Sequence, residues 1–293
     1  MVQGSWISFV HKRMSRHRIV LCAALLSACV HALAQTGELG LTGGVSYYIG
    51  DINPYRHYPN HTHFAAGILY RYNFNERYAL RLQGLYTTLE AYDSDSDDTL
   101  QVQRNLGFRT SLFEASALLE INFLKFRGIT KDSHNWTPYV FAGLAYYHVN
   151  PQAQLDDTWY DLQPLGTEGQ GSTMGGAPYS LDNFCIPFGA GFKFAFTDKI
   201  NVGIEWGLRK TYTDYIDDVS GVYVDNAKLA FETGPLTAAL ADRSTLRTTG
   251  INTGRARGDA QTNDWYQYTG LTVTWLLTRF TECDAIWDRM KNK

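Results

Sequence analysis

The chain has 293 residues and a formal net charge of −3, with 26 Lys and Arg against 29 Asp and Glu. This balance argues against a nucleic-acid-binding protein, which needs a basic surface. Aromatic residues make up 14% of the sequence, yet no stretch after residue 34 is long and apolar enough for a membrane helix of about 20 residues. Many aromatics at moderate hydrophobicity are typical of an outer-membrane β-barrel.

The first 34 residues have the pattern of an export signal. Basic residues precede an apolar run, Ile19–Val30, and the small-residue site Ala32-Leu33-Ala34 follows it. We therefore predict a signal peptide over 1–34, a barrel over 35–277 and a periplasmic tail over 278–293. One alternative stays open, because Leu26-Ser27-Ala28-Cys29 also matches a lipoprotein cleavage box that would leave a lipidated Cys29.

Eight segments of the mature chain alternate apolar and polar residues with a period of two, as expected of strands with one apolar face. In chain order, their apolar positions fall within 39–47, 64–72, 78–86, 113–123, 139–149, 184–196, 202–208 and 271–277. The segment 139–149 is apolar on both faces, so its orientation stays open. Eight is an even number, which bacterial outer-membrane barrels require.

Short and long connections alternate between these segments. The shorter ones are Asn73–Arg77, Leu124–Trp136 and Thr197–Ile200, and the long polar ones are Asp51–Thr62, Leu89–Gln103, Pro151–Asp182 and Thr213–Asn263. The pattern predicts an all-β fold, an eight-stranded antiparallel transmembrane β-barrel with long extracellular loops and short periplasmic turns. A soluble β-sandwich is the rival, but it would need a second sheet to cover the outward phenylalanines of 184–196.

The inward positions of these segments carry four bases and four acids. They are Arg71, Arg81, Lys193 and Arg209, and Glu38, Glu114, Glu120 and Glu205. The signs balance, as a buried set should, because an unpaired buried charge is costly. The register predicts that Arg71 lies beside Arg81, between Glu38 and Glu120, and that Lys193 meets Glu205. Two interpretations stay open, a structural plug of ion pairs and a gated proton or ion path.

The loops contain candidate ligand residues without a decisive pattern. His57, His61 and His63 lie in the first outer loop, but their spacing in a loop of unknown shape is weak evidence, so we predict no metal and no cofactor. An acidic run is expected to be a solvated loop facing lipopolysaccharide, since it lacks the Gly and terminal Glu of a calcium loop. Its members are Asp93, Asp95, Asp97 and Asp98. A second acidic group, for which no partner set is evident, is Asp214, Asp217 and Asp218.

No catalytic constellation emerges, and we predict neither an enzyme nor a small-molecule substrate. The sequence has no Gly-rich phosphate loop and no Ser elbow. His148 is the one histidine within a predicted strand, and no Ser lies at a recognisable spacing from it. A lipid-modifying barrel enzyme, which would need a nucleophile beside this His, remains a rival.

Two cysteines remain in the mature chain, Cys185 and Cys283. The first begins a strand near the outer face and the second lies in the periplasmic tail, so the bilayer should keep them apart. A leftover Cys in an oxidising compartment predicts an intermolecular disulfide or a free thiol at Cys283.

Several blocks, in their order and spacing, resemble one family over nearly the whole mature chain. They are Ser46–Asn53, Arg71–Asn75 with Ala79–Arg81, Thr137–Gly143, Gly203–Gly207 through Arg209-Lys210 to Tyr215–Gly221, and Asn263–Tyr266. Together they resemble the PorG-type outer-membrane barrels of the type IX secretion system of Bacteroidetes. Two features depart from that family, the Leu26–Cys29 box and the loop Pro151–Ser180.

This resemblance implies a role in exporting proteins that carry a C-terminal sorting signal, and contact with a periplasmic ring of PorK and PorN. It suggests no catalytic residues. Lys125, Arg127 and Lys131 of the intermediate turn, together with Cys283, are then expected to face the periplasmic partner. A stand-alone OmpA-like barrel, for envelope stability or surface ligand binding, is the alternative.

Overall fold

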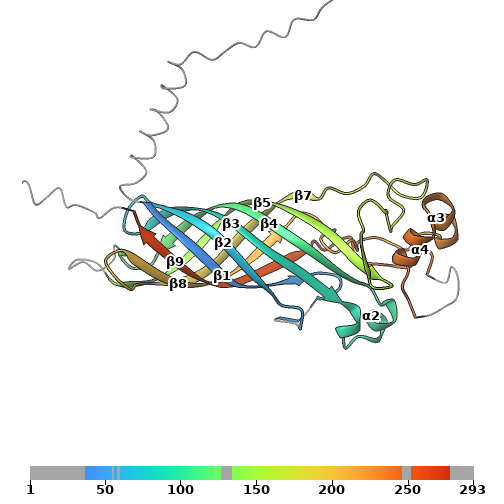
Figure 1. Ribbon diagram of the computed structural model, residues 1–293, viewed down its shortest axis with the longest axis horizontal. Helices are drawn as coiled ribbons and strands as arrows, with labels where there is room; N and C mark the ends of the chain where they lie inside the picture. Colours follow the sequence, from blue (N-terminus) through green and yellow to red (C-terminus); the bar gives the residue numbers. More distant parts are fainter. Residues whose placement is uncertain (1–36, 55, 58–59, 127–133, 246–251, 278–293) are drawn as a thin grey trace, which may run out of the picture.

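Eight long antiparallel strands form the body of the protein in the computed structural model, which describes residues 37–54, 56–57, 60–126, 134–245 and 252–277 (Figure 1). They are β1 (Gly37–Ile49), β2 (His63–Asn73), β3 (Tyr78–Tyr92), β4 (Gly107–Asn122), β5 (Trp136–Leu155), β7 (Asp182–Ala195), β8 (Ile200–Thr211) and β9 (Trp265–Leu276). The predicted signal peptide and periplasmic tail lie outside the described residues.

The sheet closes on itself. Every long strand pairs with its neighbours in the chain, and β1 pairs with β9, from Glu38 opposite Leu276 to Ile49 opposite Trp265. A short additional strand, β6 (Thr158–Asp161), pairs with the outer end of β5. The predicted closed eight-stranded antiparallel barrel is therefore confirmed.

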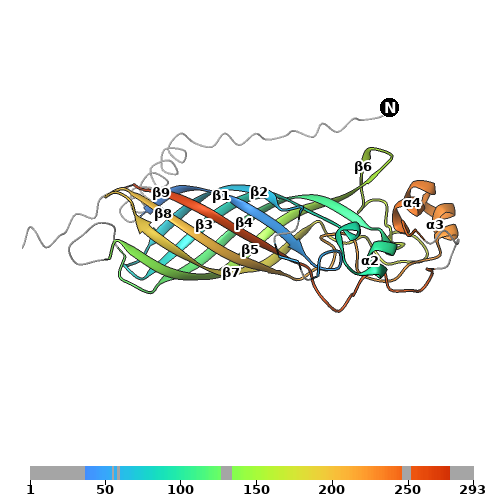
Figure 2. The same cartoon turned by 90° about the horizontal axis from the view of Figure 1, so that it is seen from below.

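The two ends of the barrel carry connections of different length. At one end lie the connections 74–77, 123–135 and 196–199, and at the other 50–62, 93–106, 156–181 and 212–264. The helices α2 (Thr99–Arg104), α3 (Asn226–Thr233) and α4 (Pro235–Ala241) lie at the long-loop end in both views (Figures 1 and 2). None of the helices in the described part of the chain is long and apolar enough to cross a bilayer.

At the end with the long loops, the sequence pattern predicted some strand ends incorrectly and missed the helices. β3 continues to Tyr92 and β5 to Leu155, past the expected loop starts at Leu89 and Pro151, because β3 keeps pairing with β4 and the end of β5 pairs with β6. The helices within the loops were not expected either. Two of them begin at a local Asp cap, Asp98 for α2 and Asp225 for α3.

The barrel is apolar outside and polar inside. Large apolar side chains on every long strand are exposed, among them Leu41, Ile68, Leu82, Phe113, Leu144, Phe184, Ile204 and Leu271, at 48–67% of their surface. The opposite face of each strand buries charged and hydroxylated residues. A belt of this size would be unstable in water but matches the hydrocarbon core of a bilayer. The chain is an outer-membrane β-barrel.

Burial also settles two orientations. In β5, Tyr139, Phe141 and Tyr147 face inward, whereas Leu144 is exposed. Tyr47, which alternation places on the apolar outer face, is fully buried instead. Its hydroxyl lies 2.7 Å from Nδ1 of His57, because the first outer loop folds over this end of β1.

Candidate functional site: the charged interior and the loop cap

Glu120 of β4 lies at the centre of a buried ion-pair cluster in the barrel. Its carboxylate is 2.9 Å from Nε of Arg71, 3.1 Å from Nε of Arg81 and 2.6 Å from Nζ of Lys193. Arg71 and Arg81 are directly paired across the β2–β3 hairpin. Two adjacent guanidinium groups repel each other, so the carboxylate between them stabilises an arrangement that neither strand could adopt alone.

Two further acids complete the cluster on either side. Glu38 contacts Nη1 of Arg71 at 2.7 Å, and Glu205 contacts Nη1 of Arg81 at 2.5 Å. The hydroxyl of Tyr139 donates to Glu205 at 2.9 Å. Three acids thus balance three bases. A separate pair lies nearer the outer end, where Arg209 Nε is 3.2 Å from Glu114.

The expected contact between Lys193 and Glu205 is wrong. In the β7–β8 hairpin, Lys193 pairs with Gly203 and Glu205 pairs with Gly191, so the two residues are not opposite each other. An eight-stranded barrel is narrow enough for side chains to meet across it. Lys193 therefore reaches Glu120, and Glu205 binds Arg81.

Arg104 at the end of α2 joins three outer loops. Its guanidinium binds Asp93 through two contacts, Nε to Oδ2 at 2.7 Å and Nη2 to Oδ1 at 2.6 Å. It also donates to the backbone carbonyls of Asp51 at 2.9 Å and Arg257 at 2.6 Å. Asp93 is fully buried, so the expectation of a solvated acidic loop is wrong for this residue. We call the outer loops 50–62, 93–106, 156–181 and 212–264, within their described residues, the loop cap.

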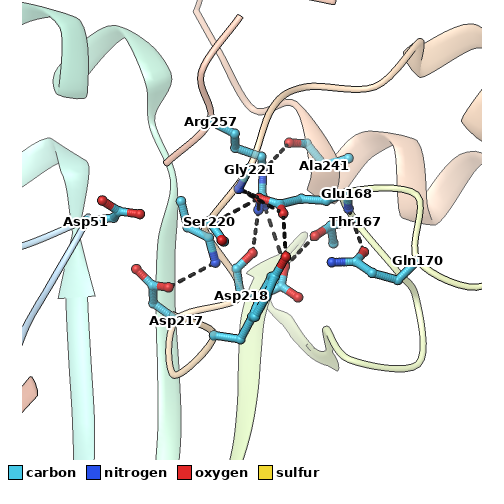
Figure 3. Close-up of polar contacts among 12 residues, drawn as sticks. Asp51, Thr167, Glu168, Gln170, Asp217, Asp218, Ser220, Gly221, Ala241 and Arg257 are labelled. Carbon is cyan, nitrogen blue, oxygen red and sulfur yellow. Dashed lines mark hydrogen bonds and ion pairs between the residues drawn. The ribbon is translucent and has the colours of Figure 1, made fainter. Parts of the chain in front are cut away.

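Arg257 is the second clamp of the loop cap (Figure 3). Its Nη1 is 3.0 Å from Glu168 in loop 156–181, and its Nη2 is 3.5 Å from Asp218 in loop 212–264. Its Nε donates to the carbonyl of Ala241, at the end of α4. Burial raises the pKa of Asp218 to about 6, although Arg257 partly offsets the effect. The partners that the sequence did not reveal for the Asp218 side chain are thus Arg257, Thr167 and Tyr179.

Glu168 also accepts hydrogen bonds from the backbone N–H groups of Ser220 at 3.0 Å and Gly221 at 3.1 Å. The side chain of Asp218 accepts from the hydroxyls of Thr167 and Tyr179, at 2.5 and 2.7 Å. Loops 156–181 and 212–264 are therefore tied by several charge-assisted bonds, which are stronger than neutral ones.

Two buried carboxyls share one tyrosine beneath the cap. The hydroxyl of Tyr48 lies 2.6 Å from both Asp217 and Asp264. Burial first, and then the neighbouring carboxyl, raises the pKa of Asp217 well above its ordinary value, and burial does the same for Asp264. A phenol has one proton to donate. Two short contacts to carboxyls therefore require that the pair itself holds a proton.

The remaining predicted residues are spread over the barrel. Cys185 is a buried free thiol, 3.4 Å from the hydroxyl of Tyr266. His148 is half-exposed on the outer wall, with Nδ1 2.8 Å from Asp182. Among the described residues, no serine hydroxyl bonds to this histidine. His61 and His63 lie close to Glu90, whereas His57 binds Tyr47 elsewhere.

The barrel end with the short turns, which is predicted to face the periplasm, has a cavity of about 530 Å³ at the mouth of the barrel. It is lined by the turn between β2 and β3, by Glu38 of the ion-pair cluster and by Lys125 and Phe126. Lys125 is exposed. Arg127, Lys131 and Cys283, predicted to face the same partner, lie outside the described residues.

Comparison with protein families gives one match. A model described as "Domain of unknown function (DUF6089)" matches residues 16–238, most of the chain. The chain belongs to this family. Among curated proteins, none matches.

Several solved outer-membrane barrels resemble the chain in outline. The Neisserial surface protein A has a TM-score of 0.40 at 10% identity, over 82% of this chain and 97% of that one. The N-terminal barrel of Pseudomonas aeruginosa OprF has a TM-score of 0.34 at 13% identity, over 81% and 96%. The Ail protein of Yersinia pestis, solved with a heparin analogue, has a TM-score of 0.36 at 10% identity, over 82% and 97%.

Proposed function

We propose that this barrel is a non-enzymatic outer-membrane component of the type IX secretion machinery, which anchors or docks the periplasmic ring. The resemblance of the blocks from Ser46–Asn53 to Asn263–Tyr266 supports this function. The ion-pair cluster around Glu120 is the observation that supports a role other than that of an open channel, because its charged side chains are buried inside the barrel. A barrel with a filled interior acts through its two ends and its position in the membrane.

The periplasmic end is the proposed docking face for PorK- and PorN-like ring proteins. The cavity there combines charged rim residues, Glu76, Arg77 and Lys125, with the aromatic rings of Phe74 and Phe126. A polar rim around apolar contacts is a common composition for protein interfaces. We include Arg127, Lys131 and Cys283 in this face on the basis of the sequence.

Deleting the gene in its native host tests the secretion role. Proteins with C-terminal sorting signals should then accumulate in the periplasm, and a plasmid copy should restore their surface location. If these proteins still reach the surface, the secretion role is wrong and the barrel fold alone stands.

Variants of the docking face locate the contact. Lys125→Glu should weaken co-purification of the ring proteins about tenfold or more, whereas Lys228→Glu, on the exposed helix α3 at the opposite end of the barrel, should not. Cys283→Ser should abolish any ring-protein band that shifts on non-reducing gels. An unchanged band pattern would leave the docking proposal without its covalent part.

The loop cap supports a second candidate, a stand-alone OmpA-like barrel that stabilises the envelope or binds a surface ligand. Ordered outer loops held by Arg104 and Arg257 present a fixed surface to the outside. Under this function the deletion strain secretes normally but becomes sensitive to detergent, and the loop cap becomes the face to test for ligands such as lipopolysaccharide.

A further inference from the structure

Two histidines and a glutamate meet on the barrel where β2 and β3 enter the loop cap. One ligand atom from each of His61, His63 and Glu90 lies within 4.8 Å of the other two. Nε2 of His63 is 2.7 Å from Oε2 of Glu90, and Nδ1 of His61 is 3.5 Å from Oε1. Two imidazoles and one carboxylate are a donor set that zinc prefers in proteins. We propose that these three residues bind a divalent transition-metal ion, with Zn²⁺ as the expected occupant.

The neighbours of this triad orient it as the second layer of a metal site does. His61 turns Nδ1 toward Glu90, and its other nitrogen, Nε2, lies 3.1 Å from Oδ2 of Asp95. The hydroxyl of Tyr92 donates to Oε1 of Glu90 at 2.7 Å. A carboxylate that holds the far nitrogen of a ligand histidine fixes its tautomer and ring orientation.

The contact between His63 and Glu90 is close but is not aligned as a hydrogen bond. Nε2 of His63 is buried and has no hydrogen-bond partner among the described residues, although the carboxylate oxygen is close. Its N–H direction therefore does not meet that oxygen. Buried polar atoms are nearly always satisfied, and an ion shared with Glu90 would satisfy this one.

The arginine opposite Glu90 does not form an ion pair with it. Arg109 is paired directly opposite Glu90 in β4, where an ion pair between the two would be usual. Its guanidinium lies over the ring of Trp159 instead, 3.8 Å from the centroid. In the described chain, the basic side chains in contact with the Glu90 carboxylate are the two imidazoles.

An ion can reach the triad from outside. The side chains of His61 and His63 are 32% and 33% exposed, and that of Glu90 is 12% exposed. A groove of about 310 Å³ runs past His63, Glu90 and Arg109. Three protein ligands beside open space leave a fourth coordination position for water, as in zinc sites that exchange a ligand.

The test is a titration of the outer-membrane protein, purified in detergent, with ZnCl₂ alone. We expect one zinc per chain by isothermal titration calorimetry. His61→Ala, His63→Ala and Glu90→Gln should each weaken binding about 100-fold, and Asp95→Asn about 10-fold. Mg²⁺ and Ca²⁺, which prefer oxygen ligands, should bind far more weakly than Zn²⁺.

Two other histidines are matched controls. His57→Ala, in the same loop but bound to Tyr47, and His148→Ala, on the outer wall, should keep the affinity of the native chain. Circular dichroism confirms that each variant keeps its strands. Zinc binding that survives the three ligand substitutions is adventitious and overturns the proposal, and so does an equal loss in His57→Ala or no binding at all.

Discussion

The barrel interior and the loop cap both bury charges, but they compensate them differently. In the barrel, four acids face four bases, and each contacts at least one charge of opposite sign. In the described part of the loop cap, six buried carboxyls accompany two clamping arginines, Arg104 and Arg257. The carboxyls are Asp93, Glu168, Asp214, Asp217, Asp218 and Asp264.

The difference in balance predicts a difference in response to pH. A cluster in which bases match acids keeps its charges without help from protons. A cluster with surplus buried carboxyls has to hold protons, because an uncompensated buried charge is costly. The barrel should therefore keep the same stability as the pH changes, whereas the loop cap should become less stable as the pH rises and its buried carboxyls lose their protons.

The largest expected effect follows from Glu120→Gln, which removes the charge that three cations share. Breaking one member of a buried ion-pair network costs about 3–5 kcal/mol, because its partners stay buried and unpaired. We expect the free energy of unfolding, measured by urea titration in detergent, to fall by about this amount. Asp97→Asn is the control, since the Arg56–Asp97 pair is exposed and should contribute at most about 1 kcal/mol. Equal losses in both variants would refute a special role for the interior.

A smaller and local effect is expected from Arg257→Met. The substitution leaves Glu168 and Asp218 buried without their shared cation, so loops 156–181 and 212–264 should separate while the barrel stays folded. Limited proteolysis within these loops should accelerate about 100-fold. Lys228→Met, which breaks the exposed pair with Glu232, is the matched control and should change the rate little. Global unfolding of Arg257→Met would show that barrel and cap are one cooperative unit.

The same two regions show how far sequence reasoning reaches. The barrel follows from a local rule, the period of two, which placed the charges at Glu120 and Arg81 on one face. Their partners depend on closure of the sheet, since Lys193 and Glu120 are 73 residues apart in sequence. The register of a hairpin predicts contacts between neighbouring strands, but it does not predict contacts between side chains that meet across the barrel.

The contacts of the loop cap are harder to predict from local sequence patterns than those of the barrel. Arg257 and Glu168 are 89 residues apart and lie in different loops, so no spacing relates them. Asp264 precedes Trp265, the first residue of β9, and belongs to the block Asn263–Tyr266 that carries part of the family resemblance. Nothing in that block predicts that Asp264 shares Tyr48 with Asp217. The Asp caps of α2 and α3 were readable signals, since Asp at an N-cap is a common helix start.

A pH titration sharpens the comparison. Burial raises the pKa of Asp214 to about 7 and that of Asp218 to about 6. A carboxyl whose pKa is higher in the folded state stabilises that state when it is protonated. This contribution is complete at pH values below about 3.9, the pKa of an Asp in the unfolded chain. It is lost as the pH rises through about 6 to 7.

Hydrogen exchange can measure this loss. Amides of loop 212–264 should be protected about tenfold more at pH 5 than at pH 8, after correction for the intrinsic exchange rate, whereas amides of β2 and β3 should show no such change. Asp214→Asn keeps the shape and removes the charge, so it should flatten much of the dependence. Loop protection that instead rises with pH would contradict the surplus of buried carboxyls.

The smallest expected effect is that of Asp225→Ala at the start of α3. The side chain of Asp225 accepts hydrogen bonds from the N–H groups of Ala227 and Lys228, at 3.0 and 3.1 Å. Losing an N-cap of this kind costs about 1 kcal/mol, so exchange in α3 should accelerate about fivefold, with loop 156–181 unaffected. If Asp225→Ala opens loop 156–181 as much as Arg257→Met does, the helices hold the cap together. If it does not, the ion-pair clamp between distant loops does so, and the cap owes its order to charge rather than to local secondary structure.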